Sequence, residues 1–135
     1  MKRLLCILLA LVCGLSGCTI TAPQADEEET GMSTYRQISQ EEAKKMMDEK
    51  AYDVILDVRE QNEYAESHIP GAVLLPLGAI DAGSAAEVIP AEDSVVLVYC
   101  RSGRRSKIAS EQLAEMGYAN IYEFGGIIDW PYDVE

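Results

Sequence analysis

The sequence predicts an α/β fold, with helices on both faces of a parallel sheet, and two observations indicate it. The first is a set of short, unbroken apolar runs at 54–56, 72–75 and 95–99, which are typical of strands buried on both faces. The second is a set of helix-compatible stretches between and after these runs, the clearest at 105–116. Strands that alternate with helices are the pattern of an α/β sheet.

The first helix is predicted to begin after Ser39, because Ser39 and Glu42 stand at the spacing of a capping box. In such a box the serine hydroxyl accepts from the backbone N–H of the glutamate, whose side chain reaches back to the start of the helix. Ala43, Met46 and Met47 follow at helical spacing. We expect these three residues in the core.

The remaining strands and the last helix follow in order along the chain. The run at 54–56 is followed by Asp57, and the run at 95–99 is the longest and the richest in β-branched residues. The helix at 105–116 has an apolar face and a glycine, Gly117, at its end. That face consists of Ile108, Ala109, Leu113 and Met116. A last short strand is predicted at 121–123.

Composition narrows the classes of protein to consider. The chain has 135 residues, of which 48% are hydrophobic and 25% charged, and its formal net charge is −12. This length suits one domain with a buried core. The composition excludes a wholly disordered chain and a membrane protein with several spans. Because nucleic-acid phosphates require a basic surface, the acidic balance argues against nucleic acid as a partner.

The first residues have the features of a secretory signal. Lys2 and Arg3 precede an apolar stretch at 4–12, which is shorter than the about 20 residues of a membrane span. The sequence Leu-Ser-Gly-Cys at 15–18 resembles a bacterial lipobox, in which the cysteine is lipidated and becomes the new N-terminus. We therefore expect a signal peptide at 1–17 and an extracytoplasmic protein, anchored by acyl chains such as palmitate to a bacterial membrane of the cell envelope. The alternative is a plain signal peptide with an incidental cysteine.

The cysteines point to one reactive position. Residues 18–33 are expected to form the lipidated cysteine and a flexible, acidic spacer, and the folded domain is expected at 34–135. Loss of 1–17 removes Cys6 and Cys13, and lipid occupies Cys18, so Cys100 remains as the free thiol. A solitary thiol cannot form an internal disulfide, and in an oxidising compartment it is a liability unless it is buried or used.

Cys100 comes directly after the run at 95–99, and a glycine-containing loop leads from it into the helix at 105–116. Ligands bind at the carboxyl ends of strands in open α/β sheets, and a helix N-terminus offers unpaired N–H groups and a positive dipole end. These features favour the nucleophilic thiolate form. The basic residues gathered here are Arg101, Arg104, Arg105 and Lys107. The alternative is a buried, inert cysteine at a strand end.

The motif Cys-Arg-Ser-Gly-Arg-Arg-Ser at 100–106 resembles the active-site loop of rhodanese-type sulfurtransferases. The resemblance covers nearly all of 34–135, and its departure is Ser67, where the family more often has glycine before the histidine. Further matching pieces are Asp57-Val58-Arg59-Glu60, Glu63-Tyr64, His68-Ile69-Pro70-Gly71-Ala72, Gly125-Gly126 and Trp130.

The resemblance implies a single rhodanese domain, a three-layer fold with a five-stranded, mainly parallel sheet and helices on both faces. It implies that Cys100 takes the outer sulfur of a donor such as thiosulfate, holds it as a persulfide and passes it to a thiophilic acceptor, cyanide or a thiol. No metal or organic cofactor is required, and the acceptor thiol can belong to a partner protein. Backbone N–H groups and positive charge of the loop are expected to bind the small anionic donor and the persulfide. These loop residues are Arg101, Ser102, Gly103, Arg104 and Arg105.

Two other functions stay open. A non-catalytic persulfide carrier or interaction module would use the same loop to hand sulfur to a partner. A cysteine phosphatase or arsenate reductase is disfavoured by loop length, because four residues lie between Cys100 and Arg105, whereas the phosphatases, including the rhodanese-like ones, use five. The shorter loop fits a single sulfur atom better than a tetrahedral oxyanion.

The resemblance also assigns structural roles near the site. Asp57 and Arg59 are expected to order the neighbouring loops through ion pairs. His68 is expected to belong to a turn, because sulfur transfer to a preformed thiolate needs no general base. Trp130 is expected either to shape the entrance of the active-site pocket or to pack into the core near the C-terminus. Tyr99 has no assigned role.

Overall fold

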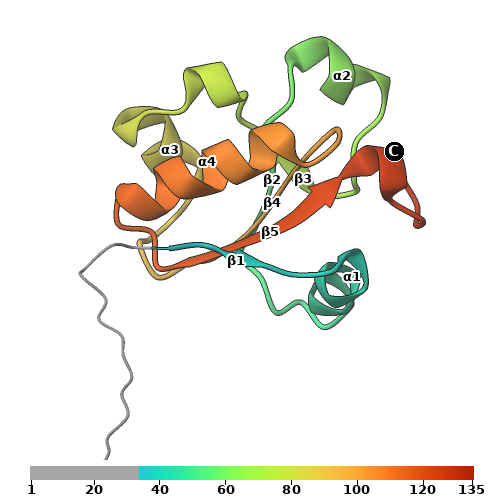
Figure 1. The fold of residues 1–135 in the computed structure, drawn as a ribbon, viewed down its shortest axis with the longest axis horizontal. Coiled ribbons are helices and arrows are strands. Elements are labelled where there is room, and N and C mark those ends of the chain that lie inside the picture. Colours follow the sequence, from blue (N-terminus) through green and yellow to red (C-terminus); the bar gives the residue numbers. More distant parts are fainter. Residues whose placement is uncertain (1–33) are drawn as a thin grey trace, which may run out of the picture. The chain divides into compact units, whose positions relative to one another are not determined.

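The computed structural model describes residues 34–135 (Figure 1). The strands are β1 (Arg36–Gln37), β2 (Val54–Asp57), β3 (Ala72–Leu74), β4 (Val95–Cys100) and β5 (Asn120–Gly126). The helices are α1 (Gln40–Asp48), α2 (Gln61–Glu66), α3 (Ala82–Val88) and α4 (Arg104–Glu115), with 3₁₀ turns η1 (Leu77–Ala79) and η2 (Ile127–Asp129). The expected signal peptide at 1–17, the expected lipidation of Cys18 and the expected acidic spacer lie outside the described residues.

The strands form one sheet in the order β1-β5-β4-β2-β3, and each neighbouring pair is parallel. This confirms the predicted α/β fold. β4 lies at the centre of the sheet, and its Tyr99 pairs in register with Asp57 at the end of β2. The carboxyl ends of the two strands therefore meet at one edge, where the loops that follow them come together.

Alternation along the central strands sends side chains into two cores. Val96 lies in a core with Leu113 of α4, whereas its neighbour Leu97 lies in a second core with Ala43 of α1 and with Trp130. The sheet is thus buried on both faces, which explains its unbroken apolar runs. Both cores belong to one compact unit, which has what a domain needs to fold by itself.

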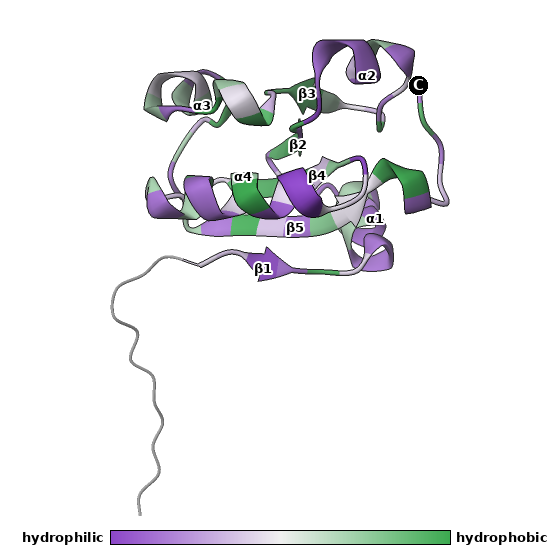
Figure 2. Ribbon diagram, turned by 45° about the horizontal axis from the view of Figure 1, so that its top comes forward, coloured by the Kyte–Doolittle hydropathy of each residue, from purple (hydrophilic) through white to green (hydrophobic). Residues whose placement is uncertain are grey.

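The helices lie on both sides of the sheet. α1 covers one face, and α3 and α4 cover the other (Figure 1). Hydrophobic and hydrophilic residues alternate along the α4 ribbon, as expected for a helix with one buried face (Figure 2). The four predicted apolar residues of this helix are buried or half-buried.

The capping box of the first helix is confirmed. Glu42 N–H donates to Ser39 Oγ at 3.0 Å, and Ser39 N–H donates to the Glu42 carboxylate at 3.1 Å. The last helix begins at Arg104, one residue before the predicted start, and Gly117 follows it with a φ of +104°. The left-handed backbone at this position is a common helix stop.

Two strand predictions need correction. β4 includes Cys100, which pairs with Gly126 across a register shift, so the cysteine ends the strand instead of following it. β5 extends over Asn120–Gly126, well beyond the predicted 121–123, because it lies inside the sheet between β1 and β4. Within 34–135, no helix is long and apolar enough to cross a membrane.

Candidate active site

Cys100 lies at the carboxyl end of the central strand, directly before the turn into α4. Its side chain is buried, with 1% exposure. The backbone N–H of Gly103 donates to Cys100 Sγ at 3.0 Å, and Gly103 is also the N-cap residue directly before α4. The sulfur therefore lies at the positive end of a helix, where negative charge on it is stabilised.

Glycines shape the loop that joins Cys100 to α4. Gly103 has a φ of +99°, which a residue with a side chain adopts only at a cost. Gly126 of β5 lies so close to the loop that a Cβ atom there would stand 2.0 Å from the carbonyl oxygen of Arg101. That carbonyl accepts a bond of 3.1 Å from the Ile128 N–H. The loop is thus held against the end of β5 and the start of η2.

A serine and a glutamate lie behind the sulfur. Ser106 of α4 is fully buried, and its Oγ stands 3.4 Å from Cys100 Sγ. The same hydroxyl is 2.6 Å from Oε1 of Glu123, which also accepts from the Gly125 N–H at 2.8 Å. Sequence reasoning gave Ser106 and Glu123 no role. The sequence did contain one signal for Glu123, since it is an acidic residue in a predicted strand and lies between the apolar Tyr122 and Phe124.

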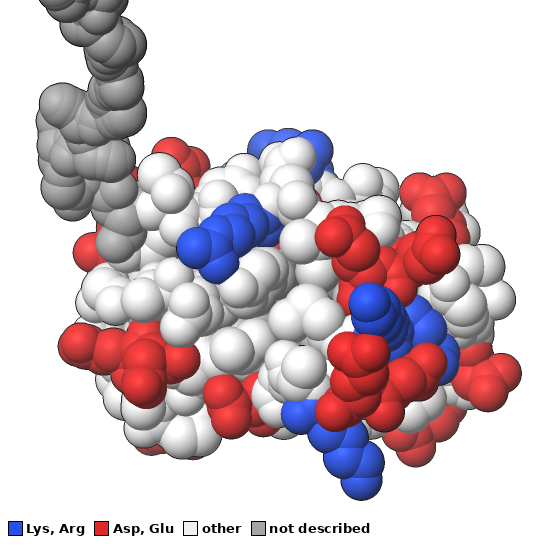
Figure 3. All heavy atoms as spheres, turned by 90° about the horizontal axis from the view of Figure 1, so that it is seen from below, with Lys and Arg blue, Asp and Glu red and all other residues white. Residues whose placement is uncertain are grey.

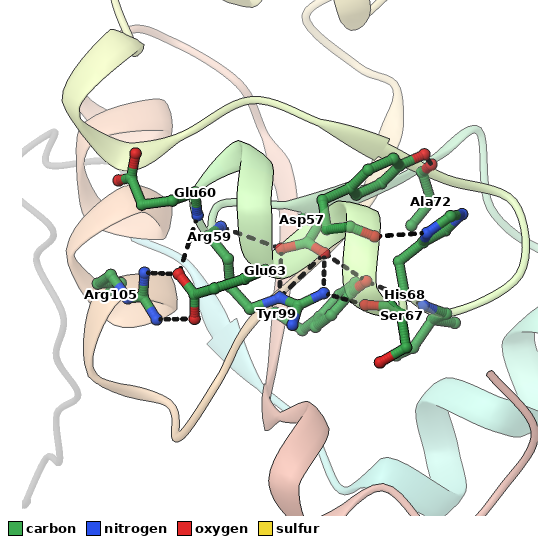
Figure 4. Close-up of polar contacts among 11 residues, drawn as sticks. Asp57, Arg59, Glu60, Glu63, Ser67, His68, Ala72, Tyr99 and Arg105 are labelled. Atoms are coloured by element: carbon green, nitrogen blue, oxygen red, sulfur yellow. Dashed lines mark hydrogen bonds and ion pairs between the residues drawn. The ribbon is translucent and has the colours of Figure 1, made fainter. Parts of the chain in front are cut away.

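The three loop arginines have different surroundings. Arg101 and Arg104 are exposed, whereas Arg105 is held by Glu63 of α2 through two bonds of 2.7 and 2.9 Å (Figure 4). The hydrogen bonds from Arg105 lower the pKa of Glu63 to about 2, and Glu63 in turn raises the pKa of Arg105. Two of the three expected anion-binding guanidinium groups are therefore free at the surface, and the third is fixed in place.

Asp57 and Arg59 form a buried ion pair at the end of β2 (Figure 4). Arg59 Nη2 lies 2.7 Å from Asp57 Oδ2 and donates to the Ser67 carbonyl at 2.7 Å. The Tyr99 hydroxyl donates to the same Asp57 oxygen at 2.7 Å and accepts from the Ile69 N–H at 3.0 Å. Burial raises the pKa of Tyr99. Tyr99, for which the sequence suggested no role, thus ties β4 to the segment after α2.

His68 and Trp130 have packing contacts. The His68 ring stacks on Tyr64 with centroids 3.9 Å apart, and its Nδ1 donates to the Tyr64 carbonyl at 3.0 Å. Its backbone exchanges two hydrogen bonds of 2.8 Å with Glu135. Trp130 is buried against Phe124, with centroids 5.6 Å apart. The His68 backbone and the Trp130 side chain therefore hold the C-terminal segment to the domain.

A cleft of about 230 Å³ opens beside the cysteine loop. Arg101 contributes to it from the loop, and Ile128, whose exposed fraction is 62%, contributes from η2. The other lining residues are Arg59, Glu63, Glu66, Ser67 and Ile127. No group of three or more metal-ligating side chains occurs among the described residues. The cleft thus combines two arginines, two glutamates and an apolar rim.

The side of the molecule that carries α1 has mixed charge (Figure 3). Acidic and basic side chains intermingle there, and α1 itself contains Glu41, Glu42, Lys44 and Lys45. Two of the exposed basic residues, Arg101 and Arg104, lie instead in the loop and helix start next to Cys100. Positive charge is thus available where a small anion would approach the thiol.

The chain is similar to known proteins over the described region. The rhodanese-like domain family matches residues 39–131. Thiosulfate sulfurtransferase PspE of Escherichia coli (strain K12) is 38% identical over 74 residues, which cover 55% of this chain and 70% of that protein. The putative sulfur carrier protein YrkF of Bacillus subtilis (strain 168) is 35% identical over 99 residues, 73% of this chain and 52% of that protein.

A solved structure described as a rhodanese with anions from E. coli has a TM-score of 0.55 and 34% identity, and covers 61% of this chain and 95% of its own. The relative named as a sulfurtransferase supports a sulfurtransferase activity. For the relative named as a carrier, the match to this chain covers only about half of that protein's length.

Proposed function

The chain belongs to the rhodanese-like domain family, and from that premise we propose that it moves a sulfane sulfur from thiosulfate, or a similar small anionic donor, to a thiophilic acceptor through a persulfide on Cys100. One observation carries the proposal. The thiol of Cys100 ends the central strand and receives the Gly103 N–H at 3.0 Å, at the start of α4. A sulfur anion at this point is stabilised by a backbone donor and by the helix dipole.

The reaction has two covalent steps. In the first, the Cys100 thiolate attacks the outer sulfur of thiosulfate, a new S–S bond forms, and sulfite leaves with the electron pair of the broken bond. In the second, an acceptor such as cyanide or a thiolate attacks the outer sulfur, and Cys100 leaves as the thiolate. Each step keeps the total charge, so neither requires an added oxidant or reductant.

The arginines divide the work of handling the anions. Arg101 and Arg104 are exposed and attract a doubly charged donor toward the loop. Arg105 cannot leave its position easily, because Glu63 holds both of its terminal nitrogens. Its charge acts on Cys100 from there, which favours the thiolate and the anionic persulfide.

A persulfide carrier is the second candidate function. The B. subtilis relative supports it, since that protein is named a putative sulfur carrier. The burial of Cys100 also supports it, because a cysteine residue that is only 1% exposed is protected until a specific partner reaches it. A carrier accepts and releases one sulfur without sustained turnover on small acceptors.

Intact-protein mass spectrometry tests the proposed function. A chain that begins at Thr19 retains the compact unit and leaves Cys100 as its only thiol. After incubation with thiosulfate we expect the mass of one added sulfur atom, which cyanide removes as thiocyanate, and no gain for Cys100→Ser. Sustained thiocyanate production supports the enzyme, and loading without turnover supports the carrier. No added sulfur on a folded, reduced protein would contradict thiosulfate as the donor.

A further inference from the structure

Glu123 is a buried carboxylate that the sulfur-transfer steps leave without a role. It lies in β5 with 3% exposure, and none of the ion pairs among the described residues includes it. Its Oε1 accepts from two donors, Ser106 Oγ at 2.6 Å and the Gly125 N–H at 2.8 Å. A carboxylate without a cation is costly to bury, so its place behind the reactive cysteine calls for an explanation.

The hydroxyl of Ser106 connects this carboxylate to the sulfur. A hydroxyl has one proton to donate and two lone pairs to accept with. At 2.6 Å the contact with Glu123 has the length of a charge-assisted bond, which assigns the Ser106 proton to Glu123. The lone pairs of Ser106 Oγ are then free to accept the thiol proton of Cys100, whose Sγ is 3.4 Å away.

We propose that Glu123 is the acceptor of the Cys100 thiol proton, which reaches it through Ser106. This inference rests on the proposed function, because it supplies the thiolate that attacks the donor. The S–H bond of Cys100 breaks as an O–H bond forms at Ser106 Oγ, and the original Ser106 proton passes to Glu123 Oε1. One anion, the carboxylate, becomes another, the thiolate, so the net charge of the buried site does not change.

The new arrangement is stabilised at each atom. The Ser106 hydroxyl now donates toward the sulfur, and the Gly103 N–H continues to donate to it at 3.0 Å. The neutral carboxyl of Glu123 donates to Ser106 in turn. When an acceptor later removes the outer sulfur, the same path returns the proton to Cys100. Glu123 acts through Ser106 and does not itself touch the reacting sulfur, so it is a positioning residue and not a catalytic one.

Few other groups lie near this path. Glu123 contacts Ser106 of α4 at 2.6 Å. The Ser106 hydroxyl also stands 3.1 Å from the Gly103 carbonyl oxygen and 3.4 Å from the Gly125 carbonyl oxygen, both longer contacts than the one to Glu123. Directly after β1, the Ile38 N–H donates to the main-chain carbonyl of Glu123 at 2.9 Å, and from α1 the Gln40 side chain donates to the Gly126 carbonyl at 2.8 Å. Arg105 adds positive charge toward Cys100. In the proposed relay the thiol and the carboxylate share one proton.

The pH dependence of Cys100 alkylation tests the relay. With iodoacetamide on the chain that begins at Thr19, we expect a two-step profile in the parent, with a plateau of reactivity at acidic pH. Glu123→Gln should give a single step, with a rate lower by about tenfold or more near pH 6 and unchanged near pH 9. Glu111→Gln, which removes an exposed carboxylate of α4, should behave as the parent.

Other outcomes would overturn the proposal. A buried anion that merely repels the thiolate predicts the opposite result, a faster reaction of Glu123→Gln near pH 6. An unchanged two-step profile would also refute the relay. Ser106→Ala cuts the path without removing the carboxylate and should lose the same acidic plateau, which covers the case in which Glu123→Gln does not fold. Alkylation needs no sulfur donor, so a failure of the relay can be distinguished from a failure of sulfur transfer.

Discussion

At the scale of single residues, the reactivity of Cys100 depends on neighbours that have no reactive group. Gly126 is the clearest case, since a Cβ atom there would meet the carbonyl oxygen of Arg101 at 2.0 Å and the amide nitrogen of Ser102 at 2.5 Å. Both contacts involve the main chain, which cannot turn aside as a flexible side chain does. The loop can hold the Gly103 N–H against the Cys100 sulfur only if position 126 has no side chain.

Gly126→Ala should therefore move the loop and impair sulfur transfer. We expect a loss of about 10²-fold in the rate of thiocyanate formation, because a displacement of about 1 Å at a reacting group has that effect. The free energy of unfolding in urea should fall by about 1–3 kcal/mol. Gly78→Ala is the matched control, since a Cβ there meets nothing within 4 Å. Equal activity of the two variants would contradict the close contact.

The sequence identifies the nucleophile at this scale but not its support. Cys100 could be predicted because a lone thiol, a strand end and clustered arginines coincide in a short motif. Tyr99 and Glu123 could not, because their roles depend on partners 42 and 17 residues away in the chain. Arg105 was expected to be free for substrate, and its bond to Glu63 depends in the same way on how α2 meets α4.

At the scale of elements, the bond between Glu63 and Arg105 joins α2 to the start of α4. Both side chains are half-buried, with exposed fractions of 20% for Glu63 and 25% for Arg105. The pair keeps the helix that begins beside Cys100 next to the segment that carries the Asp57–Arg59 ion pair. Its contribution to stability should depend on pH, because the pKa of Glu63 falls to about 2 in the folded chain from 4.5.

The sign follows from that lowered pKa. The folded state holds the ionised form more tightly, so the stabilisation is complete above about pH 4.5 and is lost as the pH falls toward 2. Glu63→Gln should lower the free energy of unfolding by about 1 kcal/mol near neutral pH, and the difference from the parent should vanish near pH 2. Urea unfolding at several pH values measures it, with Glu66→Gln, an exposed carboxylate of α2, as the control. A difference that persists at the lowest pH would show that the ion pair is not its cause.

The elements themselves could be predicted where their signal is local. The apolar runs of β2 and β4 and the capping box of α1 are properties of a few adjacent residues, and the structure confirms them. The full length of β5 could not be predicted, because its ends are polar or glycine, and its position between β1 and β4 is set by pairing. β1, with two exposed residues, has no apolar pattern at all.

At the scale of the whole molecule, the site and both cores lie in the described residues 34–135, and the residues before them have a sequence pattern of their own. The sequence at 15–18 resembles a lipobox, and an acidic spacer separates it from the domain. We propose that lipid on Cys18 holds the domain at a bacterial membrane. A domain whose proposed reactive residues all lie within 34–135 should work equally well with or without that anchor.

Replacement of Cys18 by alanine tests the anchor. The full chain produced in a bacterium should be found in the membrane fraction, resist an alkaline wash, and carry the mass of its acyl chains, since stable anchoring takes more than one chain. Cys18→Ala should lose the lipid mass and accumulate with its first 17 residues attached. Cys13→Ala, which changes a cysteine of the preceding segment, should remain lipidated. Because the compact unit is the same in all three, thiocyanate formation in detergent extracts should be equal, and a parent chain without lipid would refute the anchor while leaving the chemistry of Cys100 untouched.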